Sequence, residues 1–169
     1  VDRPVADLPT VTVGRADLAG DNGQQSTVIA VRQSPTNDMA LAKLDKPITD
    51  IRPIQLSRVA PAVGDTLRLT GFGSTTSVNP VPSTVLQTGE FTVSKVTDST
   101  IEVVGRAPEP DTSACPFDSG APYFAERGDS EPTLVSVEST GPSCPHSDAE
   151  TTSRVDNVAT WVEDIIRSD

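Results

Sequence analysis

Short runs of β-branched and other apolar residues, separated by turn residues, recur along most of this chain and constrain its fold more than any other feature. The 15 prolines and 11 glycines favour short elements joined by many turns over long helices. The spacing of the runs is typical of antiparallel strands. They occupy residues 10–14, 26–31, 39–44, 66–73, 85–96, 100–105, 121–126 and 134–140. The sequence therefore predicts an all-β fold.

Only the C-terminal residues carry a helical pattern. The apolar residues that share one helical face are Val158, Trp161, Val162, Ile165 and Ile166. Asp156 precedes them and is the expected N-cap. We expect one amphipathic helix to close the chain.

The charge balance excludes several classes of partner. The chain has 24 acidic and 13 basic side chains and a net charge of -11, which argues against nucleic acid and anionic membranes. It contains no run of about 18 apolar residues, so no transmembrane span is expected. No charged and then apolar leader precedes the fold, so we expect any signal peptide to have been removed.

The two cysteines, Cys115 and Cys144, are 29 residues apart. They form no Cys-x-x-Cys pair and no Cys/His cluster, which argues against a structural zinc site. We expect no metal and no cofactor. A disulfide is the better interpretation, and closing a loop of this length would stabilise the fold by about 3 to 4 kcal/mol. Because disulfides persist in oxidising compartments, we expect a secreted, extracellular protein.

Two segments are predicted to be long connections. Residues 45–62 carry Pro47, Pro53 and Pro61, and residues 74–83 are polar and proline-bearing. The second connection could separate two halves of the chain.

Four segments line up, in order, with one family. They are the strand opened by Asn37 and Asp38, the Gly-Phe-Gly turn at 71–73, the Cys-Pro-Phe-Asp-Ser-Gly-Ala-Pro turn at 115–122, and the Ser-x-Gly-x-x-Cys run at 139–144. In these motifs the chain resembles the trypsin-like, or chymotrypsin-family, serine proteases over nearly its whole length.

The resemblance implies two antiparallel Greek-key β-barrels, the first one incomplete, followed by a C-terminal α-helix. Residues 1–73 would be the remainder of the N-terminal barrel and residues 74–84 the connection. Residues 85–154 would be the C-terminal barrel and residues 155–169 the helix.

The same resemblance assigns a nucleophile and its supporting aspartate. Ser119 matches the serine that forms the acyl-enzyme, and Asp38 matches the aspartate that orients and stabilises the catalytic histidine. Taken alone, Asp38 could be a turn residue before a strand, and Ser119 an ordinary turn serine. Their order and the flanking motifs favour the catalytic assignment.

The loop around Ser119 carries three further assignments by resemblance. Cys115 and Cys144 match the disulfide that braces the primary specificity pocket. Asp118 matches the aspartate that pairs with the new N-terminal amino group after proteolytic activation, although it could also make only local turn hydrogen bonds. The oxyanion donors would be the N–H groups of Phe117 and Ser119. Phe117 stands where the family usually has glycine, so we expect it to resist a positive φ by about 1 to 2 kcal/mol.

The specificity pocket follows from the same register. Ser113 falls at the pocket floor, and Ser139, Thr140 and Gly141 form the wall. A floor serine favours apolar or aromatic substrate side chains over cationic ones, unless Glu150 reaches in and supplies charge. We expect Glu150 to be a solvated loop carboxylate instead.

The catalytic histidine of the family has no match here, because the chain has no histidine in its first 145 residues. By the family's spacing, Val1 would fall just after the segment that carries it. His146, in the loop that follows Cys144, is expected to be a solvated loop imidazole and not the base.

The first functional hypothesis is therefore a secreted serine endopeptidase that acts on protein or peptide substrates. This chain would be inactive alone, and a separate N-terminal chain could supply the missing histidine. The alternative is a non-catalytic protease homologue that acts as a binding or regulatory module. A third interpretation, an unrelated extracellular β-sandwich with one disulfide, leaves the ordered motifs unexplained.

Overall fold

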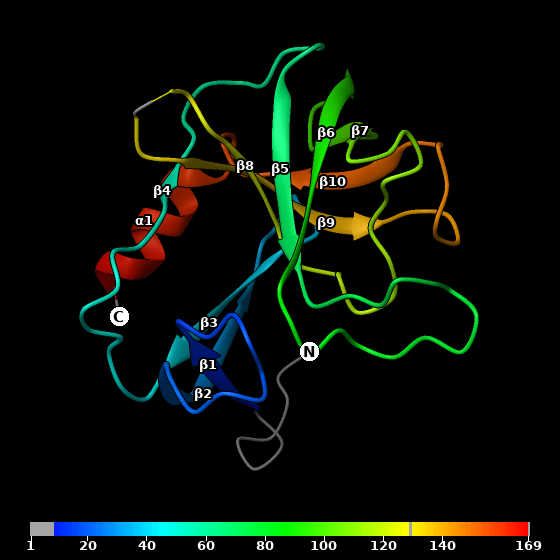
Figure 1. Cartoon of the computed structure of the whole chain (residues 1–169). Coiled ribbons are helices and arrows are strands. Elements are labelled where there is room, and N and C mark those ends of the chain that lie inside the picture. The colour runs from blue at the N-terminus through cyan, green and yellow to red at the C-terminus, as the bar shows by residue number, and fades with distance from the viewer. Residues whose placement is uncertain (1–8, 129, 169) are drawn as a thin grey trace.

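A closed six-stranded barrel forms the larger part of the molecule, in a computed structural model that describes residues 9–128 and 130–168 (Figure 1). Its strands are β5 (Thr66–Gly71), β6 (Gln87–Val96), β7 (Thr100–Ala107), β8 (Pro122–Ala125), β9 (Thr133–Thr140) and β10 (Glu150–Arg154). They are ordered β10-β7-β6-β5-β8-β9, and β10 also pairs with β9, which closes the barrel. Because β8 returns to pair with β5, the order β8-β5-β6-β7 is a Greek key.

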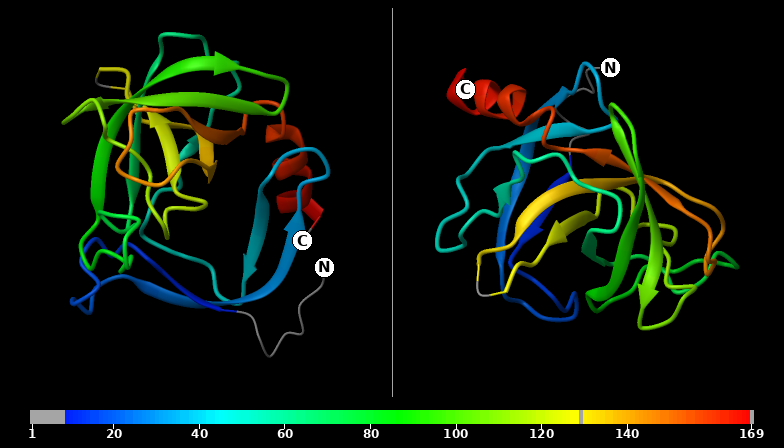
Figure 2. Two further views of the ribbon diagram at one scale, coloured as in Figure 1. Left: turned by 90° about the vertical axis from the view of Figure 1, so that its right-hand side faces the viewer. Right: turned by 90° about the horizontal axis from the view of Figure 1, so that it is seen from above.

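The N-terminal part of the chain forms a separate sheet of three antiparallel strands. These are β1 (Thr10–Val13), β2 (Gln24–Gln33) and β3 (Ala40–Leu44). Figure 2 shows this sheet, in blue and cyan, as its own layer next to the barrel. The predicted fold class, an all-β chain of two antiparallel barrels with the first one incomplete and a C-terminal α-helix, is confirmed.

The connection from β3 to β5 contains a strand that the sequence pattern did not predict. β4 (Gln55–Leu56) has only two residues and adds to the outer edge of β9 in parallel orientation. A two-residue strand has no periodicity to detect, which explains the omission.

The division between the two parts does not fall where the sequence placed it. β5 was expected to close the first barrel at residue 73, but it pairs with β6 and β8 in the second. The segment 74–84 therefore links two neighbouring strands of one barrel. The chain crosses from the first sheet to the barrel between Leu44 and Thr66.

The core of the barrel follows from alternation along its strands. In β6 the buried residues are Gly89, Phe91 and Val93, and in β7 they are Ile101 and Val103. Alternate residues of a strand point to one face, so these side chains fill the interior. The Phe91 ring meets Tyr123 of β8 edge to face, with ring centroids 5.2 Å apart.

The C-terminal helix α1 (Ala159–Ser168) begins three residues later than the expected cap. The carboxylate of Asp156 is not the N-cap, because it binds the Arg154 guanidinium, with Nη2 2.7 Å from Oδ2. The first helical bond runs instead from the Val162 N–H to the Val158 carbonyl at 3.0 Å. Within residues 9–128 and 130–168, no helix is long and apolar enough to cross a membrane.

Candidate active site

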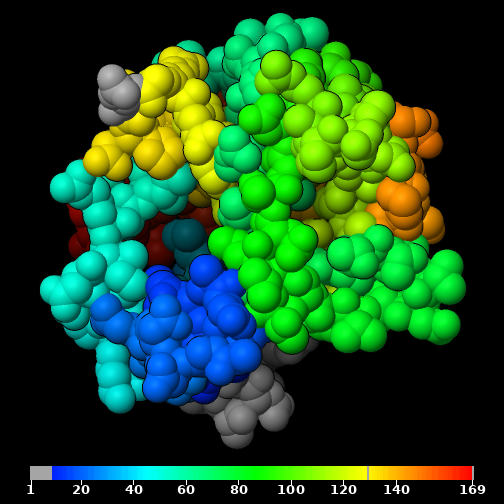
Figure 3. Space-filling model, viewed as in Figure 1, coloured from blue at the N-terminus to red at the C-terminus, as the bar shows by residue number. Residues whose placement is uncertain are grey.

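Asp38 and Ser119, which are far apart in the sequence, line one pocket of about 480 Å³. The pocket lies where β3 and the residues before it face β9, Leu56 and Val162 of α1. Figure 3 shows a hollow between the blue first sheet, the cyan connection and the yellow strands, with the dark red helix behind it. The fold thus brings the two predicted catalytic residues to the junction of the two sheets.

Asp38 is positioned by its neighbour and by β9. The buried Asn37 amide donates to the Arg154 carbonyl at 2.8 Å and to Asn157 Oδ1 at 2.9 Å, which ties this segment to the barrel. The Ser139 hydroxyl then donates to Asp38 Oδ2 at 2.7 Å. Ser139, predicted as a pocket-wall residue, therefore also orients the aspartate.

The loop that carries Ser119 is held by backbone hydrogen bonds. The Gly120 N–H donates to the Glu138 carbonyl, and the Glu138 N–H donates to the Ala121 carbonyl, both at 2.9 Å. The loop is closed by an Ala121 N–H bond to the Asp118 carbonyl at 2.8 Å. Ser119 itself is exposed, and its hydroxyl has no hydrogen-bond partner in the described part of the chain. A serine hydroxyl is a weak nucleophile until a base takes its proton, so this hydroxyl is accessible to such a base but is not activated by the residues described.

Phe117 adopts the conformation that its residue type disfavours. Its φ is 79°, in the left-handed region, so the loop holds Phe117 in a positive-φ conformation in spite of the expected cost. The phenyl ring is exposed, which leaves it free of clashes with the core. Neither the Phe117 N–H nor the Ser119 N–H has an acceptor among the residues that the structure describes. Two such unpaired donors beside a serine are what an oxyanion hole requires.

Asp118 is buried and braces the same loop. Its carboxylate accepts the Gly73 N–H at 2.9 Å and the Cys115 N–H at 3.0 Å. A Cβ on Gly71 or Gly73 would collide with this carboxylate, which explains the glycines of the Gly-Phe-Gly turn. Asp118 also borders a second cavity of about 490 Å³.

The predicted specificity pocket is a third cavity, of about 400 Å³, and Ser119 lines it as well. One wall is residues 139–141 and the other is residues 114–116. The predicted disulfide between Cys115 and Cys144 is present and links the two walls. Ser113 does not line this pocket: it borders the cavity of Asp118, and its hydroxyl accepts the His146 N–H at 3.2 Å.

Glu150 is buried in the predicted specificity pocket, so the expectation of a solvated loop carboxylate is wrong. Only 1% of Glu150 is exposed, and its Oε1 accepts the Ala114 N–H at 2.8 Å. His146 is not solvated either, since its Nε2 lies 2.9 Å from Glu150 Oε1 with 8% of the side chain exposed. Burial raises the pKa of Glu150, and the nearby His146 partly offsets this.

A further acid that sequence reasoning missed, Glu138, lies between the two pockets of Ser119. It lines both of them, and its Oε2 accepts the Tyr123 hydroxyl at 2.8 Å. Burial raises the pKa of Glu138 to about 8 and raises that of Tyr123 as well. The alternation of β9 does place residue 138 on the inner face with Ser136, so the signal was an acid at an inward position.

The raised pKa of Glu138 predicts a loss of stability with rising pH. The folded state keeps the proton from the ordinary glutamate pKa of about 4.5 up to about 8, so the stabilisation present below pH 4.5 is lost as pH rises through 8. Over that range the loss is about 1.4 kcal/mol per pH unit. Glu138→Gln should remove this slope and be more stable than the wild type at pH 8.5, as measured by urea unfolding.

The control for this measurement is Glu131→Gln, which changes an exposed glutamate that pairs only with Arg52. It should follow the wild-type dependence on pH. Parallel curves for the wild type and Glu138→Gln would show that residue 138 does not carry a raised pKa.

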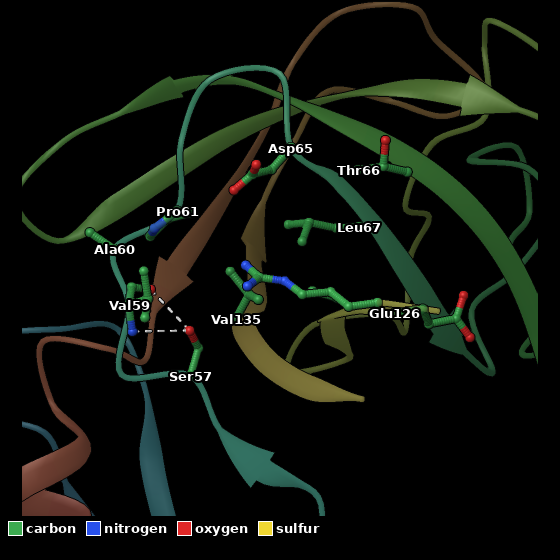
Figure 4. Close-up of a pocket in the computed structure, with 11 residues that line it drawn as sticks. Ser57, Val59, Ala60, Pro61, Asp65, Thr66, Leu67, Glu126 and Val135 are labelled. Atoms are coloured by element: carbon green, nitrogen blue, oxygen red, sulfur yellow. Dashed lines mark hydrogen bonds between the residues drawn. The ribbon is translucent and has the colours of Figure 1, made fainter. Parts of the chain in front are cut away.

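Two further observations argue against a competing site. The pocket in Figure 4 lies between the connection and β8, and its Ser57 hydroxyl is occupied by the backbone of Val59, donating to the carbonyl at 2.9 Å. In residues 9–128 and 130–168, no three His, Cys, Asp or Glu side chains form a group that could hold a metal.

Comparisons with known proteins agree with this fold. A family model described as Trypsin matches residues 5–162 of the chain. The structure of neuropsin, a serine protease expressed in the limbic system of mouse brain, is similar with a TM-score of 0.79 and 19% sequence identity. That match covers 93% of this chain and 78% of the neuropsin chain. No curated protein sequence matches.

Proposed function

Because the chain belongs to the trypsin family, we propose that it is the serine-bearing part of an endopeptidase that hydrolyses peptide bonds through an acyl-enzyme on Ser119. One observation carries the proposal: Asp38 and the free Ser119 hydroxyl line one pocket, beside the unpaired N–H groups of Phe117 and Ser119. A nucleophile, an acid to orient its base and two oxyanion donors are the parts that acyl transfer needs.

In the proposed reaction, Ser119 Oγ attacks the carbonyl carbon of the substrate peptide while a histidine accepts its proton. The N–H groups of Phe117 and Ser119 donate to the oxyanion of the tetrahedral intermediate. The histidine passes the proton to the leaving amine, the C–N bond breaks, and an ester to Ser119 remains. Water, activated by the same histidine, then releases the acid and restores the hydroxyl.

The histidine must come from outside residues 1–169. His146 does not line either pocket of Ser119, and it faces Glu150 instead. We propose that a segment preceding Val1, or a separate N-terminal chain, places its imidazole between Asp38 and Ser119. We call this chain together with such a segment the completed enzyme. The chain alone should be inactive.

Asp118 has a supporting role in this proposal. Its carboxylate accepts the Cys115 N–H within the Phe117 turn and the Gly73 N–H of the neighbouring turn, and it borders a cavity large enough for another group. A new N-terminal amino group would pair with this buried carboxylate, as in the activation of related proteases.

The proposed substrates are proteins or peptides, and the proposed location is extracellular. The family supports the substrate class. The Cys115–Cys144 disulfide supports an oxidising compartment. The net charge of -11 supports neither nucleic acid nor an anionic membrane as a partner.

A fluorophosphonate probe, which labels activated serines, tests the proposal. This chain alone should remain unlabelled, the completed enzyme should be labelled at Ser119, and its Ser119→Ala variant should not be. The absence of a histidine from residues 1–145 also fits a second function, a non-catalytic homologue that binds partners. A folded completed enzyme that stays unlabelled would reject the first function and favour the second.

A further inference from the structure

We propose that Glu150 makes the specificity pocket select substrates with a lysine or arginine side chain immediately before the cleaved bond. This inference rests on the proposed function, since such a preference has meaning only for a peptidase. Selectivity is thereby assigned to Glu150, the first residue of β10, and not to Ser113, which lines a different cavity.

The Glu150 carboxylate lies inside the pocket, between its two walls. Oε1 accepts the N–H of Ala114 on one wall at 2.8 Å. On the other wall, a Cβ added to Gly141 would collide with Oε2, so this oxygen occupies the space above the Gly141 backbone. The side chain is therefore fixed across the pocket that Ser119 lines at its mouth.

Glu150 Oε2 is the part of this carboxylate left for a substrate. No hydrogen bond reaches it within residues 9–128 and 130–168, and it keeps a small contact with solvent, although only 1% of the residue is exposed. A carboxylate oxygen with so little access to water is poorly solvated, and a cationic guest would supply the missing partner. The described lining of the pocket has two carboxylates, Glu150 and Glu138, and no lysine or arginine.

An apolar or aromatic guest fits this pocket poorly. It would cover the carboxylate and remove its remaining water without supplying a donor. An acidic guest would meet Glu150 and Glu138 directly. The pocket volume of about 400 Å³ is within the size range of small-ligand sites, so a long cationic side chain is not excluded by space.

The charged groups around Glu150 set the direction of the pH dependence. His146 lies against Oε1, and Glu138 and Asp118 are the other charged groups that act on Glu150. Because burial raises the pKa of both Glu150 and Glu138, these two carboxyl groups lose their protons as the pH rises. Each change makes the pocket more negative, so cation binding should strengthen with pH.

Benzamidine, a flat aryl amidinium, provides a test that needs no catalytic histidine. We expect this chain to bind benzamidine at least 10-fold more tightly than the neutral benzamide at pH 8, by calorimetry. Glu150→Gln keeps the size and the acceptor for Ala114, and should weaken benzamidine binding about 10- to 100-fold, the effect of losing a charge-assisted contact. It should also flatten the pH dependence.

Glu131→Gln is the matched control, an exposed Glu→Gln change that should leave binding at the wild-type level. Urea unfolding of each variant checks that the comparison is between folded proteins. Equal affinity for benzamidine and benzamide, no binding of either by the folded chain, or full affinity in Glu150→Gln would each overturn the inference.

The completed enzyme separates this inference from the proposed function. Coumarin-linked peptides with arginine or lysine before the bond should be cleaved at least 10-fold faster, in kcat/KM, than those with phenylalanine. Fluorophosphonate labelling without a Glu150-dependent affinity for benzamidine would reject only the selectivity. Glu150-dependent binding without labelling would reject only the peptidase.

Discussion

Asp38→Asn in the completed enzyme is expected to lower kcat about 10⁴-fold and leave the fold intact. The Asp38 carboxylate accepts the Ser139 hydroxyl at 2.7 Å and lines the pocket of Ser119, where the proposed function places the histidine. An asparagine can keep one acceptor, but its NH₂ group would face the imidazole N–H and favour the wrong tautomer. The measurement is the steady-state hydrolysis of a coumarin-linked peptide, with KM changing little.

Asp21→Asn is the control, because Asp21 is an exposed loop residue outside both pockets of Ser119. It should keep the wild-type rate. Urea unfolding should give Asp38→Asn a stability close to that of the wild type, since Asp38 is exposed. A fall in kcat of less than 10-fold would show that Asp38 does not orient the base.

The local sequence pattern predicted the positions of most strands, and the resemblance assigned Asp38 and Ser119 to one site, where both line the same pocket. Each run of β-branched residues between turns corresponds to a strand, since alternation and turn chemistry are local properties. The resemblance also paired Cys115 with Cys144, and this disulfide is present. The assignment of Asp38 and Ser119 to one site rests on several motifs in a fixed order, which is stronger evidence than either residue alone.

The pairing of strands was predicted less well than their positions. β5 has the same pattern as the strands of the first sheet, yet it hydrogen-bonds to β6 and β8. Alternation shows that a strand has one buried face but not which neighbour it joins. The predicted boundary at residue 73 therefore follows β5, whereas the chain enters the barrel before β5.

At the site, tertiary contacts determine the conformation of Phe117 and the burial of Glu150, which the sequence analysis did not foresee. Phe117 takes φ 79° because the surrounding loop is fixed by hydrogen bonds of Asp118 and Gly120, which outweigh a local cost of about 1 to 2 kcal/mol. Glu150 was expected in solvent, as glutamates usually are, but the Ala114 N–H and the His146 ring meet it inside the barrel. Ala114 lies 36 residues from Glu150 and His146 lies four residues from it. Neither contact follows from the local sequence pattern.

Cys115→Ser with Cys144→Ser is expected to lower the free energy of unfolding by about 3 kcal/mol. The disulfide closes a loop of 29 residues, so its removal frees the unfolded chain. The loss should lie at the low end of the range for such loops because Ser77 also holds Cys144. The Ser77 hydroxyl accepts the Cys144 N–H at 2.7 Å, and the Ser77 N–H donates to the Cys144 carbonyl at 3.1 Å.

Urea unfolding of the double variant, compared with the wild type in a strong reductant, measures this loss. The reduced wild type should match the double variant, because both lack the same covalent link. Benzamidine affinity should also fall in both, since the disulfide joins the two walls of the specificity pocket. A double variant within 1 kcal/mol of the oxidised wild type would mean that Ser77 and the strands alone set the distance between these walls.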